Sequence, residues 1–307
     1  MKKAYVVLFC SVMFLIFIPA TNAVEYVFFS NQGNSISRSA LDGSGCQTIL
    51  YDRDSYCPYV GELAVDSIHQ SLYYVGEWKI KKCNFNGSNP QTLFSTQNEP
   101  GGLAIGGNKM YWTEVEKICR ANLDGSSRED VITNLGNCFS LTYDNVHNKL
   151  YYVGYEDLGW TKGAIFRADP DGKNIERLID NIGLSVGLAI DPYSSKIYWA
   201  SRSNSYNSIK SSNLDGTGII DLITGQQNPL IECVDHLDID LVRHKLYWTD
   251  QGSPGGVQRM NTDGTGYEVI YYSGSPYGIA VFIPEPGTIC LFGVAGLIMR
   301  KRMKSEE

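Results

Sequence analysis

The chain has 307 residues with 33 acidic and 26 basic side chains, which gives a formal net charge of −7. This acidic balance disfavours nucleic acids and anionic lipids as partners, because phosphate binding needs a cationic surface. The length between the terminal segments suits one large all-β domain or two smaller ones.

Residues 1–23 are predicted to be a secretory signal peptide. Lys2 and Lys3 precede the apolar run AYVVLFCSVMFLIFIPA, and the small residues TNA then suit cleavage after Ala23. The alternative is a retained membrane anchor, but no basic polar flank follows the apolar run. We therefore expect an exported protein whose mature chain begins near Val24.

Three motifs recur in step along residues 24–283. An aromatic strand appears in six copies, which begin at Val27, Leu72, Met110, Leu150, Ile197 and Leu246. Each copy is followed by a turn that ends in a glycine, namely Gly43, Gly87, Gly125, Gly172, Gly216 and Gly264. These turns need the positive φ that glycine supplies. The third motif is a small-apolar strand such as GLAID, which precedes the aromatic strand.

A basic residue stands five positions before the turn glycine in all copies but one. The copies carry Arg38, Lys82, Arg120, Arg167 and Arg259, and the exception is Ser211. Because a ligand site needs one place rather than six, we interpret these residues as structural partners of neighbouring acids.

The repeat predicts an all-β fold, a six-bladed β-propeller with four-stranded blades. The mature chain begins with an aromatic strand, and its missing small-apolar strand is YGIAVF, at Tyr277 to Phe282, near the other end. The two ends should therefore complete one blade together, which closes the ring and removes two sheet edges. Trp112, Trp199 and Trp248 occupy the repeat position and should be core residues.

The combination of KLYWTD, LDG turns and GLAID strands resembles the low-density lipoprotein receptor class B repeat, the six-bladed YWTD propeller. The resemblance covers about Glu25 to Phe282 and implies a protein-binding scaffold rather than an enzyme. Gly76, Gly154 and Ser201 stand where the motif has its acid, so we expect weaker polar contacts between blades there. No EGF-like module accompanies the repeats, so receptor function is not carried over.

The candidate ligand-binding residues lie on loops expected at one rim of the ring. The connections after the aromatic strand are longer in the last three copies, GYEDLGWTKG, SRSNSYNS and DQGSPGG, and long loops on one face are a usual place for binding. Exposed Tyr, Trp and Arg are enriched at binding hot spots. The predicted set is Tyr155, Glu156, Asp157, Trp160, Arg202 and Tyr206, with Tyr56 and Tyr59 from the loop DRDSYCPYV. The alternative is that these loops only pack on themselves.

Catalysis is the competing class of function. Six-bladed propellers also include metal-dependent hydrolases and lyases, which need carboxylates or histidines converging on the axis. Only Glu62, Asp235, His236 and Asp238 offer titratable groups there. His69, His147 and His244 share one turn of the repeat, so His236 is the histidine that the repeat does not explain. We predict no catalytic residue, no metal and no cofactor.

Cysteine content agrees with export. Cys46, Cys57, Cys83, Cys119, Cys138 and Cys233 lie between the terminal segments, and an even number in an oxidising compartment allows up to three disulfides. The sequence does not choose among the possible pairings. No Cys-x-x-Cys or paired-histidine spacing indicates a zinc site.

Residues 284–307 form a distinct tail. Pro284, Glu285 and Pro286 precede an apolar run from Gly287 to Met299 and a basic cluster that includes Arg300, Lys301 and Arg302. A run this short barely crosses a bilayer, which normally requires about 20 residues. The tail resembles the PEP-CTERM sorting signal of bacterial exported proteins, which implies transient membrane attachment and cleavage by an exosortase-like peptidase. The alternative is a simple C-terminal anchor.

Together these features predict a non-enzymatic binding or scaffold protein of the bacterial cell surface or extracellular matrix. Its predicted partners are signal peptidase, the exosortase-like peptidase, and an extracellular protein or polysaccharide. A purely structural matrix protein and a metal-dependent hydrolase or lyase are the alternatives.

Overall fold

The computed structural model describes residues 24–31, 34–52, 60–98, 100–155, 163–202, 206–272 and 274–284. Within these ranges the secondary structure consists of strands and their connections, and no helix is long and apolar enough to cross a bilayer. Residues 25–283 form one compact unit.

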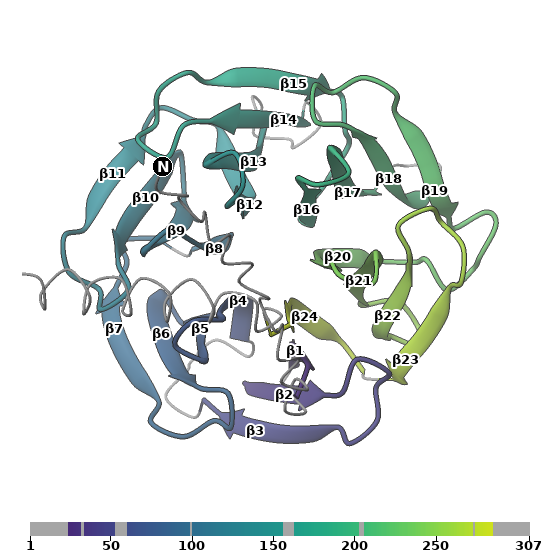
Figure 1. Ribbon diagram of the computed structural model, residues 1–307, viewed down its shortest axis with the longest axis horizontal. Helices are drawn as coiled ribbons and strands as arrows, with labels where there is room; N and C mark the ends of the chain where they lie inside the picture. The colour runs from purple at the N-terminus through teal and green to yellow at the C-terminus, as the bar shows by residue number, and fades with distance from the viewer. Residues whose placement is uncertain are drawn as a thin grey trace, which may run out of the picture. The chain divides into compact units, whose positions relative to one another are not determined.

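Six four-stranded antiparallel sheets surround a common axis and form the six blades of a β-propeller (Figure 1). The inner strands, nearest the axis, are β24 (Pro276–Phe282), β4 (Val60–Asp66), β8 (Leu103–Gly106), β12 (Asn137–Asp144), β16 (Leu188–Asp191) and β20 (Val234–Asp240). The second strands are β1 (Tyr26–Asn31), β5 (Ser71–Gly76), β9 (Lys109–Glu114), β13 (Lys149–Tyr155), β17 (Lys196–Arg202) and β21 (Lys245–Asp250). We number the blades 1 to 6 in this order.

The third and outer strands complete each blade. The third strands are β2 (Ser35–Ser39), β6 (Lys79–Asn84), β10 (Lys117–Asn122), β14 (Gly163–Ala168), β18 (Asn207–Asn213) and β22 (Gly256–Asn261). The outer strands are β3 (Gln47–Tyr51), β7 (Gln91–Ser95), β11 (Glu129–Ile132), β15 (Glu176–Asp180), β19 (Ile220–Thr224) and β23 (Glu268–Tyr272). The architecture predicted from the repeat is confirmed, and each aromatic motif is the second strand of a blade.

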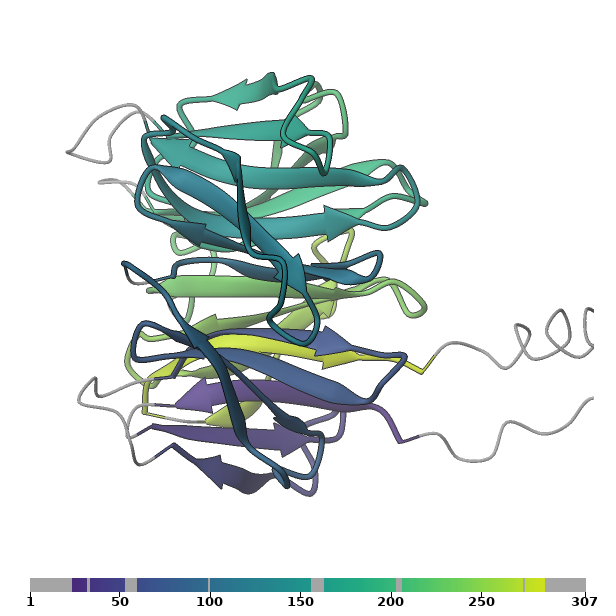
Figure 2. The same cartoon turned by 90° about the vertical axis from the view of Figure 1, so that its left-hand side faces the viewer.

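Blade 1 contains both ends of the folded unit. β24 pairs with β1 in antiparallel register, with Val27 opposite Val281 and Phe28 opposite Ala280. Figure 2 shows β1 beginning and β24 ending at the same side of the ring. We call this side the exit face, and the opposite side, where the inner strands begin, the mouth face. The predicted closure of the ring by its two terminal strands is confirmed.

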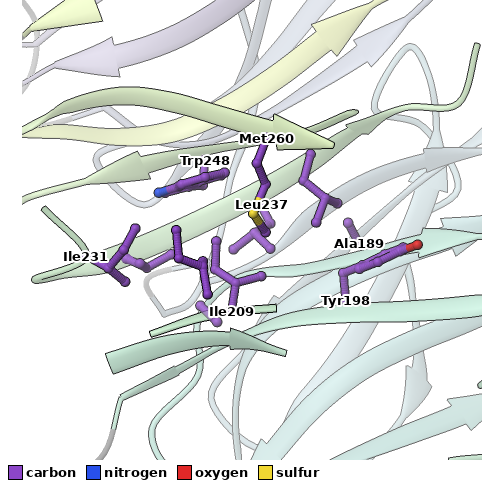
Figure 3. Close-up of a cluster of buried hydrophobic side chains, with 11 residues drawn as sticks. Ala189, Tyr198, Ile209, Ile231, Leu237, Trp248 and Met260 are labelled. Carbon is purple, nitrogen blue, oxygen red and sulfur yellow. The ribbon is translucent and has the colours of Figure 1, made fainter. Parts of the chain in front are cut away.

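The core lies between neighbouring blades. In the cluster of Figure 3, Trp248, Leu237 and Met260 of blade 6 pack against Tyr198 and Ile209 of blade 5. Trp112, Trp199 and Trp248 are each at most 3% exposed, as predicted. Aromatic side chains bury large apolar areas, so the regular placement of these rings holds successive sheets face to face.

The conserved geometry of the Asp-Gly turns explains the glycines. All six turn glycines have φ between 80° and 87°, a region that side chains disfavour. A Cβ on Gly172 would also lie 2.1 Å from the carbonyl oxygen of Val131 in the preceding blade. The turns on the exit face therefore dock onto the neighbouring blade as well as reversing the chain.

The arginines of the third strands connect adjacent blades. Arg120 donates to the carbonyl oxygen of Pro170 at 2.9 Å, and it also pairs with Glu129 of its own blade at 2.7 Å. Arg38, Arg167 and Arg259 make the corresponding bonds to carbonyl oxygens of Phe85, Leu214 and Leu41. The predicted pairing with acids is confirmed for Arg120, Arg167 and Arg259, and the bonds to the next blade are an addition.

The expected weakening at Gly76, Gly154 and Ser201 needs correction at two of the three positions. A buried ion pair fills the place of the missing acid at Gly76, because Lys81 Nζ lies 2.7 Å from Asp52 Oδ2 and a Cβ on Gly76 would be 2.6 Å from the same oxygen. Ser201 Oγ donates to the carbonyl oxygen of Ile182 at 2.7 Å. Polar contacts between blades are thus re-formed by different residues.

The described cysteines form no disulfide with one another. Cys46, Cys83, Cys119, Cys138 and Cys233 are free thiols. None of the predicted disulfides among these five cysteines forms. The sixth, Cys57, lies outside the described residues.

We expect Gly278→Ala to destabilise the propeller. Its Cβ would lie 2.4 Å from the carbonyl oxygen of Gly61 and 3.0 Å from Glu62 Cα, which are backbone atoms of the next inner strand. The free energy of unfolding should fall by about 1–3 kcal/mol in urea titrations.

The matched control for this prediction is Gly274→Ala, whose Cβ would meet no atom within 4 Å. That variant should differ from wild type by less than about 0.5 kcal/mol. Equal stability of the two variants would show that close approach of the inner strands is not required.

Candidate functional site

A cavity of about 450 Å³ opens at the axis on the mouth face. All six blades contribute to its wall, and we call it the mouth cavity. One residue from each blade illustrates this, namely Tyr277, Glu62, Gly101, Phe139, Val186 and His236. Cavities of about 300–1,000 Å³ are the usual size of small-molecule sites, so the mouth cavity is large enough for a small ligand or a protruding side chain.

Irregular strand pairing directs the side chains into the mouth cavity. The register between β20 and β21 shifts between Val234 and Leu237, and that between β4 and β5 shifts between Val60 and Leu63. A third shift in β12 lies between Cys138 and Ser140. Bulges re-aim side chains, so Glu62, Phe139, Asp235 and His236 all stand at positions released from regular pairing.

His236 and Glu62 form a buried ion pair across blade 1. The Nε2 atom of His236 lies 2.5 Å from Glu62 Oε2, and the two side chains are 10% and 12% exposed. The Nδ1 atom of His236 donates to the carbonyl oxygen of Tyr277 at 3.2 Å. Both ring nitrogens are therefore engaged, and the pair connects blades 6 and 2 over the closing strand β24.

The protonation of this pair follows from its surroundings. Burial alone would lower the pKa of His236, but the charge of Glu62 and its hydrogen bond outweigh burial and raise the pKa to about 9. Burial raises the pKa of Glu62, and the charge of His236 opposes that change. At neutral pH the imidazole is the cationic partner, so it has no lone pair to act as a general base.

Asp235 is held by two side chains from neighbouring strands. Arg202, at the end of β17, pairs with Asp235 Oδ1, and its Nε donates to the carbonyl oxygen of Val234 at 2.9 Å. Gln251 donates to Asp235 Oδ2. Each carboxylate oxygen of Asp235 thus has a donor, and the arrangement links blades 5 and 6 beside the mouth cavity.

Asp238 lies deeper along β20. It accepts the backbone N–H of Val281 at 2.7 Å and that of Ile239 at 2.8 Å. Burial raises the pKa of Asp238 to about 7, although both hydrogen bonds favour the charged form. This carboxyl contacts the closing strand β24 and so belongs to the joint between blades 6 and 1.

The rest of the wall is largely apolar. Phe139, Val186 and Leu184 are partly exposed on one side of the cavity, and Val115 at the rim is 51% exposed. Glu77 stands on the rim near blade 2. The mouth cavity therefore combines an apolar side with a side of charges that already have partners.

The structure describes only some of the predicted site residues. Arg202 lines the mouth cavity, as described above, and Tyr206 is partly exposed one residue before β18. Glu156, Asp157, Trp160, Tyr56 and Tyr59 lie outside the described residues. In the tail only Pro284 is described, so the predicted sorting residues Glu285, Pro286, Arg300, Lys301 and Arg302 are outside the described ranges as well.

Tyr155 requires a correction, because its ring is buried rather than exposed. The residue is 2% exposed and is the last residue of β13. Its hydroxyl donates to the carbonyl oxygen of Ser185 at 3.0 Å, and Phe139 packs against its ring at a centroid distance of 5.8 Å. Because β13 continues to Tyr155, the side chain supports the cavity wall from behind.

Sequence reasoning missed the apolar side of the mouth cavity. Phe139 and Val186 precede the small-apolar strands by one residue and resemble ordinary strand residues. The ion pair, by contrast, has a signal in the sequence at the position just before the first large apolar residue of the small-apolar strand. Four copies have a small residue there, namely Gly102, Ser140, Gly187 and Gly278, and the other two have Glu62 and His236. An acid and a base that replace small residues in two copies of a repeat indicate a pair.

The described residues contain no group of three or more His, Cys, Asp or Glu side chains arranged to hold a metal ion. The carboxylates near the axis instead contact His236, Arg202 or backbone N–H groups.

Comparison with known proteins supports the fold. No family model matches the chain. A chain in the crystal structure of a nidogen–laminin complex aligns with a TM-score of 0.73 and 20% identity, covering 85% of this chain and 100% of that chain. TolB from Acinetobacter baumannii aligns with a TM-score of 0.66 and 13% identity, covering 84% of this chain and 66% of that chain.

A gluconolactonase from Xanthomonas campestris has the same arrangement, with a TM-score of 0.60 and 14% identity over 81% of this chain and 83% of that chain. A gluconolactonase and a chain from a nidogen–laminin complex therefore share this architecture, and identities this low show the fold alone. The chain is a six-bladed β-propeller whose fold is like that of the YWTD propeller of nidogen.

The pair of His236 and Glu62 predicts a pH dependence of stability. The pKa of His236 is raised from 6.5 to about 9 in the folded protein, so its stabilising contribution is complete below 6.5 and is lost as the pH rises through about 9. Urea unfolding should show this loss at up to ~1.4 kcal/mol per pH unit. Glu62→Gln should abolish it, because the pKa of His236 then falls.

Glu25→Gln provides the control, since Glu25 pairs with Arg243 on the exit face at 2.6 Å. This variant should keep the wild-type dependence between about pH 6 and about pH 10. A flat profile in wild type would contradict the assigned ion pair.

Proposed function

We propose that this protein is a non-enzymatic binding protein, exported to the cell surface or extracellular matrix, and that its ligand binds at the mouth face. The proposal rests mainly on one observation, that polar groups in the mouth cavity already have hydrogen-bond or ion-pair partners within the protein. His236 has partners at both ring nitrogens, and Asp235 has a donor at each oxygen. Such groups give shape and charge to a site without leaving a free base.

The apolar side of the mouth cavity supplies the contact area. Val115, Val186 and Phe139 remain accessible to a partner, and burying apolar surface contributes most of the free energy of association. Arg202 at the rim has a planar guanidinium held in place by Asp235, which favours contacts with carbonyl or carboxylate groups. An extracellular protein or polysaccharide is the partner class that we propose.

The long connections of blades 4, 5 and 6 support the same face. The strand ends that these connections join, β13 to β14, β17 to β18 and β21 to β22, lie on the mouth face. These three blades are neighbours in the ring (Figure 1). The three long connections therefore belong to neighbouring blades and start and end on the face that carries the mouth cavity.

We also propose that export and sorting use the two terminal segments. The signal peptide would direct secretion, and the tail would attach the protein to the inner membrane until an exosortase-like peptidase cuts near Pro284 to Pro286. This proposal rests on the sequence of the tail and its resemblance to a sorting signal.

Binding is tested with immobilised protein and fractionated extracellular polysaccharide and surface proteins of the source cells. Wild type should retain a ligand, and Val115→Asp combined with Val186→Asp should reduce retention by at least about tenfold, because a charge placed on apolar contact surface must lose its hydration. Ile219→Asp, at a 49% exposed position before β19, should retain the ligand.

Two results would contradict the binding proposal. Equal retention by wild type and the double variant would place the ligand elsewhere. Turnover of a lactone or glycoside that is lost in Glu62→Gln would favour the enzymatic alternative. Thermal unfolding of each variant should confirm that the propeller remains folded.

Processing is tested by mass spectrometry of the protein recovered from medium and membranes. We expect a mature N-terminus at Val24 and a C-terminus near Pro286 in the released form. Substituting Pro284 and Pro286 with alanine should leave the tail uncut and the protein in the membrane fraction. Release of an intact tail would contradict processing at this motif.

A further inference from the structure

Four turns on the exit face carry an exposed apolar side chain at the same position. The residues are Ile68, Val146, Tyr193 and Val242, with exposed fractions of 80%, 49%, 73% and 57%. They belong to the turns between the inner and second strands of blades 2, 4, 5 and 6, nearest the axis. We call these four residues the apolar ring.

A repeated hydrogen-bond pattern fixes the orientation of these turns. In blade 2, Asp66 Oδ1 accepts the N–H groups of Ile68 and His69, both at 3.1 Å. Asp144, Asp191 and Asp240 accept the corresponding N–H groups in the other three turns. The buried aspartates leave the third residue of each turn pointing outward.

The four apolar side chains lie at matching positions around the axis. Each turn connects an inner strand that ends at the aspartate with a second strand that begins five residues later. Equal turns in equivalent blades project to the same height above the ring. Four tips at one height form a plane rather than a groove, so they fit a flat partner.

The charges on the exit face define which flat partner is suitable. His69, His147 and Arg243 directly follow members of the apolar ring, and each also contacts the aspartate of its turn. The exposed carboxylates of the Asp-Gly turns surround this region, namely Asp42, Asp124, Asp171, Asp215 and Asp263. These carboxylates would repel a strongly anionic surface, so binding must depend on apolar contact.

The path of the chain points to the same face. β24 ends at Phe282 on the exit face. Five residues later the sequence enters the apolar run from Gly287 to Met299, which is followed by the basic cluster. A tail that inserts into a bilayer so soon after β24 would keep the exit face within a few residues of the membrane surface.

We propose that the apolar ring is a membrane-contact surface that seats the propeller, exit face down, on a bilayer while its tail is attached. This inference rests on the membrane attachment of the tail proposed above. Ile68, Val146, Tyr193 and Val242 enter the interfacial region, where Tyr and aliphatic side chains are favoured. The mouth face then points away from the membrane and stays accessible to extracellular ligands.

Tryptophan substitution tests the contact on the full chain bound to vesicles of zwitterionic phosphatidylcholine. Tyr193→Trp and Ile68→Trp should each add fluorescence that is quenched when the lipid carries bromine near the top of its acyl chains, because interfacial side chains lie ~5–10 Å into this boundary. Val115→Trp is the matched control, since Val115 is 51% exposed on the mouth face. Its added fluorescence should not be quenched.

A second measurement tests the energetic contribution of the apolar ring. Replacing Tyr193 and Ile68 together with serine should lower vesicle binding of the full chain by about tenfold. Replacing part of the phosphatidylcholine with phosphatidylglycerol should leave the ratio between wild type and this variant unchanged, because the basic cluster of the tail is present in both.

The outcomes separate this inference from the proposal on which it rests. Vesicle binding by wild type without quenching at positions 68 and 193 would overturn the membrane-contact surface and leave tail attachment intact. Failure of wild type to bind vesicles would overturn both. Quenching at positions 68 and 193 that is absent on phosphatidylcholine vesicles to which wild type still binds would also contradict an apolar contact.

Discussion

Pairing of β24 with β1 is the interaction on which the whole ring depends. It joins the last strand of the folded unit to the first, so every blade has four strands and every sheet has two neighbours. The closing blade is reinforced from both sides, because Ser30 Oγ donates to Gly61 and His236 donates to Tyr277. The ion pair of His236 with Glu62 lies above this joint, so the same residues that border the mouth cavity also fasten the ring.

Close packing of the inner strands determines what the centre of the ring can contain. A Cβ on Gly187 would lie 2.2 Å from the carbonyl oxygen of Asp235, so the strands approach more closely than side chains allow. At this position of the repeat only Glu62 and His236 are ionisable, and they neutralise each other, as Arg202 and Asp235 do beside them. The repeat therefore limits which charged groups reach the mouth cavity, and apolar residues near the start of the inner strands, such as Phe139 and Val186, line much of the rest.

The sequence allowed the blades, the turn glycines and the closing strand to be predicted because each of these features repeats in step. Arg120 could be assigned a structural role for the same reason, although its bond to Pro170 in the next blade has no signature in the sequence. The candidate site was less predictable, because His236 and Glu62 meet only after the ring closes. Tyr155 was placed on an exposed loop since the sequence does not reveal how far β13 extends, and its buried hydroxyl appears only in the folded structure.

The two faces of the propeller differ because different constraints act on their connections. On the exit face, buried aspartates such as Asp66 and Asp240 hold the inner turns to one length, and glycines such as Gly172 are docked against the next blade. On the mouth face, Glu114 accepts the backbone N–H of Asn98 and Asp250 accepts that of Cys233, so these acids hold the connections that lead into blades 3 and 6. Gly76 and Gly154 provide no carboxylate at the equivalent position. Connections that no repeated carboxylate holds can change in length without disrupting the ring. Variable recognition is therefore compatible with the mouth face, and a uniform contact with a flat surface is compatible with the exit face.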